Sequence, residues 1–272
     1  MFSISASLVN STHPESLKLI RDAGFTTIDL SHHDFGADVR DIDQIREFIQ
    51  NHDIKIGSSS GLREFGGNNS HIHEYDMDLA KSYIKTMNRL GCELLIVTPP
   101  TIRSRNIQAE RIKEDLQALA NLAIPYKVKI GLKALSWSPY IGSYQEALSL
   151  VDEINSPNLG LVLDTFHFFS ESEDLSVVAS IPTSRIFLVQ CSDFASSMTY
   201  SLEDQIETYH HKRLIPGQGF HELGIQSLIT ELNQRQYKGL FSIFANDQQY
   251  QLLDPYESLK QVLAFTSKFT TR

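Results

Sequence analysis

Charged and amide side chains follow directly on short apolar runs in this sequence. Asp164 ends the run 159–163 and begins a segment Asp-Thr-Phe-His that ends at His167, and Gln190 lies near the end of the next run. A carboxylate followed three residues later by a histidine suits a metal ligand or a general base, and an amide oxygen suits a hard cation or a substrate hydroxyl. The alternatives are structural: Asp164 could cap the turn after a strand, and Gln190 could only donate and accept structural hydrogen bonds.

Lys133 is a cation within an otherwise apolar run, 131–135. Its ammonium could pair with Asp164, act as a base or bind an anionic substrate. The alternative is that its stem packs outward between helices and its charge reaches water. We predict that Lys133 points inward, and we assign the nearby Trp137 to substrate binding.

Two arginines lie in glycine-containing segments. Arg63 stands in Gly-Leu-Arg-Glu-Phe-Gly-Gly, where a guanidinium could bind a carboxylate or phosphate through two hydrogen bonds. Arg213 opens Arg-Leu-Ile-Pro-Gly-Gln-Gly, which is typical of an ordered loop. Arg213 could contact an anionic substrate or anchor its own loop through an ion pair, and Arg63 could be an ordinary surface residue.

Histidines outside the Asp164 segment are weaker candidates. Consecutive His32 and His33, with Asp34, follow the second apolar run, and we expect at most one of the two rings to face a ligand. His71 and His73 are expected at the surface. The roles of His210 and His211 are left open.

Eight short apolar runs are predicted to be the strands that position these groups. Each is rich in Ile, Val, Leu or Phe, as in strands buried on both faces of a parallel sheet. The runs are Phe2–Leu8, Thr26–Leu30, Ile54–Ser58, Glu93–Thr98, Val128–Leu135, Leu159–Asp164, Arg185–Cys191 and Leu240–Phe244.

Amphipathic segments alternate with the apolar runs. They predict helices over Pro14–Ala23, Val39–Asn51, His73–Leu90, Ile107–Ala123, Ser143–Ile154, Gly224–Gln236 and Pro255–Phe269, with a weaker one in Glu171–Ile181. The strict alternation of apolar runs and amphipathic segments is typical of a barrel or of an open doubly wound sheet. The nucleotide-binding form of the open sheet has a Gly-rich phosphate-binding motif after its first strand, and no such motif follows the first run here. We therefore predict one α/β domain, a single (β/α)8 TIM barrel over residues 1–272, with long loops Gly57–His73 and Asp193–Phe220 at its C-terminal face.

Composition limits the function classes. The net charge of −9 argues against nucleic acid or an anionic membrane surface as the main partner. No apolar run approaches the roughly 18 residues of a spanning helix, which predicts a cytoplasmic protein. Cys92 and Cys191 are expected to be buried, reduced thiols.

Taken together, the motifs resemble the sugar phosphate isomerase/epimerase superfamily of xylose isomerase-like barrels, and within it the bacterial and fungal 3-dehydroshikimate dehydratases. The resemblance covers nearly the whole chain. It is strongest over 133–137 with 158–167, over 187–193 and over 213–219. The approach to the last strand, 237–242, is similar too, and Arg63-Glu64-Phe65 resembles a substrate-reaching Arg-Asp-Phe loop.

The resemblance also implies a metal site, which this sequence only half retains. The family binds a divalent metal with a Glu, an Asp, a Gln or His, and a final Glu. Asp164 and Gln190 match the second and third ligands, whereas Lys133 and Phe244 stand where the two glutamates are expected. Because hard cations favour several anionic oxygens, we predict no cofactor. The alternative is a weakly bound divalent metal: Mg, Mn, Co or Zn.

These observations predict a lyase or isomerase that acts without a metal on a small hydroxylated carbonyl acid or sugar. The catalytic candidates are Lys133, Asp164 and His167, and the substrate-binding candidates are Arg63, Trp137, Gln190 and Arg213. Lys133 could stabilise an enolate or form a Schiff base. The alternative function is a non-catalytic small-molecule-binding barrel or a partner subunit of an active paralogue. Whether the chain forms a homo-oligomer stays open.

Overall fold

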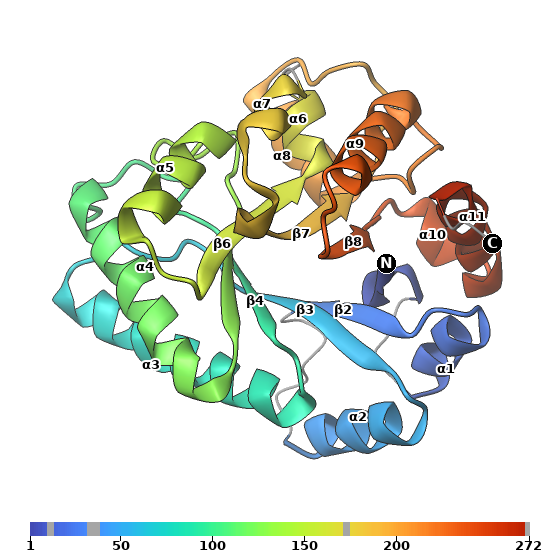
Figure 1. The fold of residues 1–272 in the computed structure, drawn as a ribbon, viewed down its shortest axis with the longest axis horizontal. Helices are drawn as coiled ribbons and strands as arrows, with labels where there is room; N and C mark the ends of the chain where they lie inside the picture. The colour runs from blue at the N-terminus through green and yellow to red at the C-terminus, as the bar shows by residue number, and fades with distance from the viewer. Residues whose placement is uncertain (10–13, 32–38, 171–174, 270–272) are drawn as a thin grey trace.

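The computed structural model describes residues 1–9, 14–31, 39–170 and 175–269. Its centre is a closed barrel of eight parallel strands, and pairing between β1 and β8 completes the ring (Figure 1). The predicted (β/α)8 barrel is therefore confirmed. The strands are Phe2–Ser5 (β1), Thr27–Ser31 (β2), Lys55–Leu62 (β3), Leu94–Val97 (β4), Lys129–Leu132 (β5), Leu159–Asp164 (β6), Ile186–Cys191 (β7) and Leu240–Ile243 (β8).

Helices surround the barrel on its outer side (Figure 1). They are Pro14–Asp22 (α1), Val39–Asn51 (α2), Ser70–Leu90 (α3), Ala109–Ala123 (α4), Tyr144–Ile154 (α5), Thr165–Ser170 (α6), Ser176–Ser180 (α7), Leu202–His211 (α8), Glu222–Gln234 (α9), Gln249–Leu252 (α10) and Pro255–Thr266 (α11). Local sequence fixes several ends: Ser143 and Glu146 form a capping box at the start of α5. None of the described helices is long and apolar enough to cross a membrane.

Apolar side chains fill two separate regions. The larger core lies between the strands and the helices and includes Ile28, Leu95 and Leu161. A small second cluster of Leu94, Ile96, Val162 and Leu188 comes from alternate positions of β4, β6 and β7. Successive strand residues point to opposite faces, so residues at alternate positions share a face, and this second cluster fills part of the inside of the barrel. Polar residues at the C-terminal ends of the strands therefore stand over an apolar floor.

The predicted loop Gly57–His73 was largely wrong. Strand β3 continues to Leu62, and α3 already begins at Ser70. The serines of this segment favoured a loop in the prediction. They fit a strand because part of the barrel interior is polar, and Ser58 Oγ donates to buried Asp29 Oδ1 at 2.7 Å. Asn69 then caps α3 by accepting from the backbone N–H of Ile72.

The predicted loop Asp193–Phe220 contains a helix, α8, which the sequence analysis did not anticipate. The side chain of Ser201 caps its N-terminus by accepting from Asp204 N–H. Helix α6, directly after β6, was also not anticipated. The weaker helix expected in Glu171–Ile181 is present only as α7, and residues 171–174 lie outside the described part of the chain. Cys92 and Cys191 are buried free thiols, as expected.

Candidate functional site

Asp164 lies at the end of β6, and both of its carboxylate oxygens are bound by one guanidinium. Arg213 donates from Nη1 to Oδ2 at 3.0 Å and from Nη2 to Oδ1 at 2.6 Å, and neither side chain is exposed to solvent. Burial by itself raises the pKa of Asp164, but the charges of Arg213 and Lys133 outweigh it and hold that pKa well below its usual range. Asp164 is therefore an ionised carboxylate, and Arg213 is its main partner.

Lys133 follows β5 and points inward, as expected. Its Nζ donates to Gln190 Oε1 at 2.9 Å, to Tyr209 Oη at 2.7 Å and to Asp164 Oδ2 at 3.4 Å. An ammonium group has three N–H donors, so these bonds use all of them. The pairing of Lys133 with Asp164 is present, but its distance is longer than those from Arg213.

Lys133, Asp164, Gln190 and Arg213 form one buried group, which we call the inner cluster. Arg213 is fixed further by a bond from its Nε to Ser192 Oγ at 2.8 Å, and its Cζ lies 4.6 Å from the centre of the Phe244 ring. The cluster holds two cations and one carboxylate, so its formal charge is +1. Of the two roles considered for Arg213, the structure favours the ion pair, although its acidic partner belongs to a strand end and not to its own loop.

His167 lies on α6 beside the inner cluster. The backbone N–H of Ser136 donates to His167 Nδ1 at 3.3 Å, so Nδ1 is an acceptor and the ring hydrogen belongs on Nε2. Nε2 is buried and has no hydrogen-bond partner among the described residues. Burial lowers the pKa of His167 to about 3. At neutral pH His167 is thus an uncharged N–H donor.

A cavity of about 580 Å³, which we call the outer cavity, opens at the C-terminal side of the barrel. Residues near the ends of β3, β4 and β5 and residues of α8 surround it, and none of the four inner-cluster residues lines it. Its lining residues are Arg63, Glu64, Thr98, Thr101, Ile102, Leu135, Trp137, Leu202, Ile206, Tyr209 and His210.

The substrate-binding candidates therefore occupy two levels. Gln190 and Arg213 belong to the inner cluster, whereas Arg63 and Trp137 line the outer cavity. Tyr209 lies where the two levels meet. It lines the cavity, and its ring centre lies 5.1 Å from Arg213 Cζ. The candidates thus form a closed cluster beside an open cavity.

The remaining histidines fall in different places. His210 lines the outer cavity, and partial burial is the main reason that its pKa is lowered. His71 is exposed, and His73 Nδ1 lies 2.9 Å from Asp115 Oδ1 at the edge of α3. The segment His32-His33-Asp34 lies outside the described residues.

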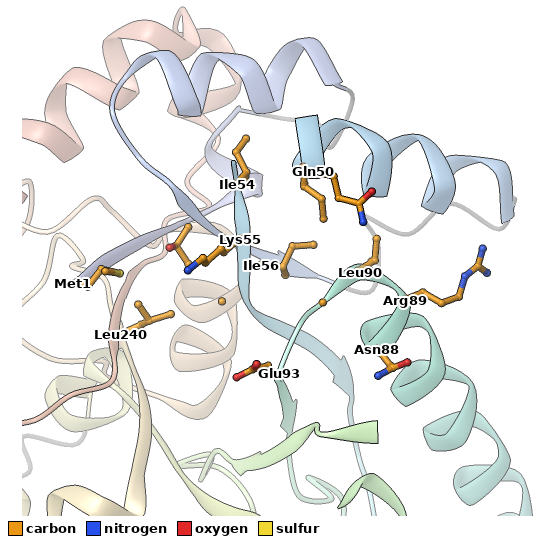
Figure 2. A pocket seen from close by; sticks show the side chains of 14 residues that line it. Met1, Gln50, Ile54, Lys55, Ile56, Asn88, Arg89, Leu90, Glu93 and Leu240 are labelled. Carbon is orange, nitrogen blue, oxygen red and sulfur yellow. The ribbon is translucent and has the colours of Figure 1, made fainter. Parts of the chain in front are cut away.

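A second cavity, of about 660 Å³, lies at the opposite end of the barrel, where β3 and β4 begin (Figure 2). Lys55, Arg89 and Glu93 are among its lining residues. Arg89 is already paired with Asp43 at 2.7 Å. The N-terminal face of a TIM barrel serves stability, whereas catalytic groups gather at the C-terminal face. We therefore place the functional site at the inner cluster and the outer cavity.

Two tyrosines of the site were missed at the level of sequence. Tyr209 could have been found from the helix signals of α8: Ser201 before it, acidic residues in its first turn and histidines in its last. Tyr144 holds the backbone of Asp164, since its hydroxyl accepts from Asp164 N–H at 2.7 Å and donates to Asp164 C=O at 3.2 Å. No local pattern marks that second role.

The chain is similar in sequence to a family of barrels and to two groups of enzymes. A family described as the xylose isomerase-like TIM barrel matches residues 17–268. The chain belongs to this family. It is 28% identical over 247 residues to a 3-dehydroshikimate dehydratase of Pseudomonas putida, covering 89% of this chain but 37% of that protein. It is 24% identical over 235 residues to an inosose isomerase of Halalkalibacterium halodurans, covering 85% of this chain and 78% of that protein. The chain thus spans little more than a third of the dehydratase that it matches.

Solved structures agree on the fold. One is a xylose isomerase-like TIM barrel/4-hydroxyphenylpyruvate dioxygenase fusion protein, with a TM-score of 0.84 and 25% identity, covering 97% of this chain and 41% of that one. Another is the IOLI protein with a binding zinc atom, with a TM-score of 0.82 and 22% identity over all of both chains.

The residues present here do not fit a divalent metal of that kind. Both oxygens of Asp164 accept from Arg213, and the amide oxygen of Gln190 accepts from Lys133 Nζ. A metal would have to displace two cations and would then meet one carboxylate and one amide. Zn²⁺ is bound by Cys, His, Asp or Glu side chains, and harder cations by several anionic oxygens, so one carboxylate and one amide disfavour both kinds of metal. Among the described residues, no three His, Cys, Asp or Glu side chains gather into a group that could hold a metal.

Proposed function

We propose that this barrel binds a small anionic, hydroxylated carbonyl compound at its C-terminal end and acts on it by lyase or isomerase chemistry without a divalent metal. The observation that carries the proposal is the inner cluster, where Lys133 and Arg213 outnumber the single carboxylate of Asp164. A fixed, buried excess of positive charge stabilises negative charge that develops on a nearby oxygen. The relatives named for 3-dehydroshikimate and inosose support a hydroxylated carbonyl compound, and the first of these two compounds is also an acid.

Each catalytic candidate takes a role that its contacts allow. Lys133 supplies buried positive charge close to the outer cavity, and it acts on an enolate oxygen there through its hydrogen bond to Tyr209. His167, with its hydrogen on the buried Nε2, contributes an uncharged ring beside the inner cluster and does not contact a molecule in the outer cavity. Asp164 accepts from Arg213 through both oxygens, so its part is to hold the two cations in place. A Schiff base on Lys133 is disfavoured, because the nitrogen would have to give up its bonds to Gln190 and Tyr209.

The test is turnover of 3-dehydroshikimate and of inosose, with and without a strong chelator. We expect activity that the chelator does not change and that falls by about 10²–10³-fold in Lys133→Met. Lys129→Met is the matched control, since Lys129 lies at the other end of the same strand and should leave turnover unchanged. Activity that disappears with the chelator and returns with added metal would refute a metal-free mechanism.

A second candidate is a barrel that binds such a compound and does not transform it. It is favoured by one observation: the three donors of Lys133 are all satisfied within the protein, which leaves the cluster complete without a substrate. Saturable binding of 3-dehydroshikimate with no product formed in the same sample would select this function over the first.

A further inference from the structure

Tyr209 joins the two levels of the site. Its ring lines the outer cavity, and its hydroxyl oxygen accepts from Lys133 Nζ at 2.7 Å. Among the described residues that line the cavity, it is the only one with a hydrogen bond to the inner cluster. Tyr209 therefore connects the buried charge of Lys133 to the cavity through a hydrogen bond.

The two cations of the inner cluster offer no donor to the cavity. Lys133 uses its three N–H groups inside the protein, and Arg213 is fully buried. The hydroxyl of Tyr209 differs, because an oxygen that accepts from an ammonium keeps its own hydrogen for another acceptor. No acceptor for that hydrogen is found among the described residues. A hydrogen bond received from a cation also polarises the phenol and makes it a stronger donor.

Arg63 provides a second anchor in the same cavity. Its neighbour Glu64 does not pair with it, since the Glu64 carboxylate accepts from Thr101 N–H at 2.7 Å and from Thr101 Oγ1 at 2.6 Å. The exposed guanidinium of Arg63 has no acidic partner in the described part of the chain and can bind a carboxylate. The apolar part of the cavity wall includes Leu135, Trp137 and Ile206.

We propose that Tyr209 is a ligand-contacting, specificity-determining residue: its O–H donates to a carbonyl or hydroxyl oxygen of an acid whose carboxylate lies on Arg63 and whose apolar face lies on Trp137. This inference rests on the proposed function and narrows its ligand. The ligand is an acid that carries, on the side of an apolar ring opposite its carboxylate, a further oxygen that can accept a hydrogen bond. The ligand meets the inner cluster through Tyr209 and does not touch Lys133 directly.

Trp137 makes the inference directly measurable, because it is the single tryptophan of the chain and lines the outer cavity. The fluorescence of Trp137 is titrated with 3-dehydroshikimate and with benzoate. Benzoate has a ring and a carboxylate but no oxygen outside that carboxylate. Tyr209→Phe should raise the Kd for 3-dehydroshikimate about tenfold and change the Kd for benzoate less than twofold. Arg63→Met should raise both, and Tyr256→Phe, an exposed tyrosine on α11, is the matched control.

The outcomes separate this inference from the proposed function. If the wild-type protein binds 3-dehydroshikimate and Tyr209→Phe binds it equally well, the role of Tyr209 is overturned and the proposed function stands. If the wild-type protein binds neither acid, both are overturned. Equal losses for the two acids in Tyr209→Phe would point to a packing role and would also overturn the inference. For Tyr209→Phe and Tyr256→Phe, benzoate binding like that of the wild-type protein is the check that the cavity has folded.

Discussion

The substitution Asp164→Asn tests the electrostatics of the inner cluster most strongly. It keeps the shape of the side chain but removes the one carboxylate that pairs with buried Lys133 and Arg213 among the described residues. Breaking a buried ion pair by removing one partner costs about 3–5 kcal/mol, because the remaining charge is left uncompensated. We expect a loss of that size in the free energy of unfolding at pH 7, measured by urea titration.

The pH dependence gives this prediction a sign. The folded-state pKa of Asp164 is lowered, so its stabilising contribution is complete above the unfolded-state pKa near 4 and declines as the pH falls below it. The difference between the wild-type protein and Asp164→Asn should therefore shrink between pH 4 and pH 2.5. Asp152→Asn, which removes an exposed pair with Arg185 at 3.1 Å, is the control and should cost less than about 1 kcal/mol. Equal losses in the two variants would refute the reasoning.

Two further predictions concern other buried polar groups. Burial raises the pKa of Asp29 in spite of bonds from Ser3 and Ser58, so its protonated form is favoured on folding and the wild-type protein loses stability as the pH rises through that pKa. Asp29→Asn should gain stability relative to the wild-type protein between pH 4 and pH 7 in a urea series, and a constant difference would contradict this. Tyr144→Phe removes the hydroxyl that bonds the backbone of Asp164 on both sides and should cost about 1–3 kcal/mol in the same assay, whereas an unchanged midpoint would contradict that role.

The barrel was predictable because its strands carry a strong local signal. The run Leu159–Asp164 is buried at every position, and its predicted and observed bounds coincide. Where the interior is polar, that signal fails: Ser58 of β3 faces buried Asp29, and the serine-rich sequence around it resembles a loop. Helix α8 was missed because it lies within a long connection whose length suggested a loop, although its capping residue was visible.

The candidate site was predictable in its residues but not in its contacts. Strand ends placed Lys133, Asp164 and Gln190 together, since parallel strands end at one face. The bidentate pair of Arg213 with Asp164 joins positions 49 residues apart, and no local pattern specifies which of two cations takes a carboxylate. The division into a closed cluster and an open cavity depends on Tyr209, which only the folded chain brings to Lys133.

Calorimetric titration with Mg²⁺, Mn²⁺, Co²⁺ and Zn²⁺ tests the central claim most directly. That claim is that Lys133 and Arg213 already bind the oxygens of Asp164 and Gln190, the two residues that match family metal ligands in the resemblance. We predict no binding at micromolar concentrations. The ammonium of Lys133 and the guanidinium of Arg213 already bind the side-chain oxygens of Gln190 and Asp164 that a metal would need. Micromolar or tighter binding that is lost in Asp164→Ala would contradict the account.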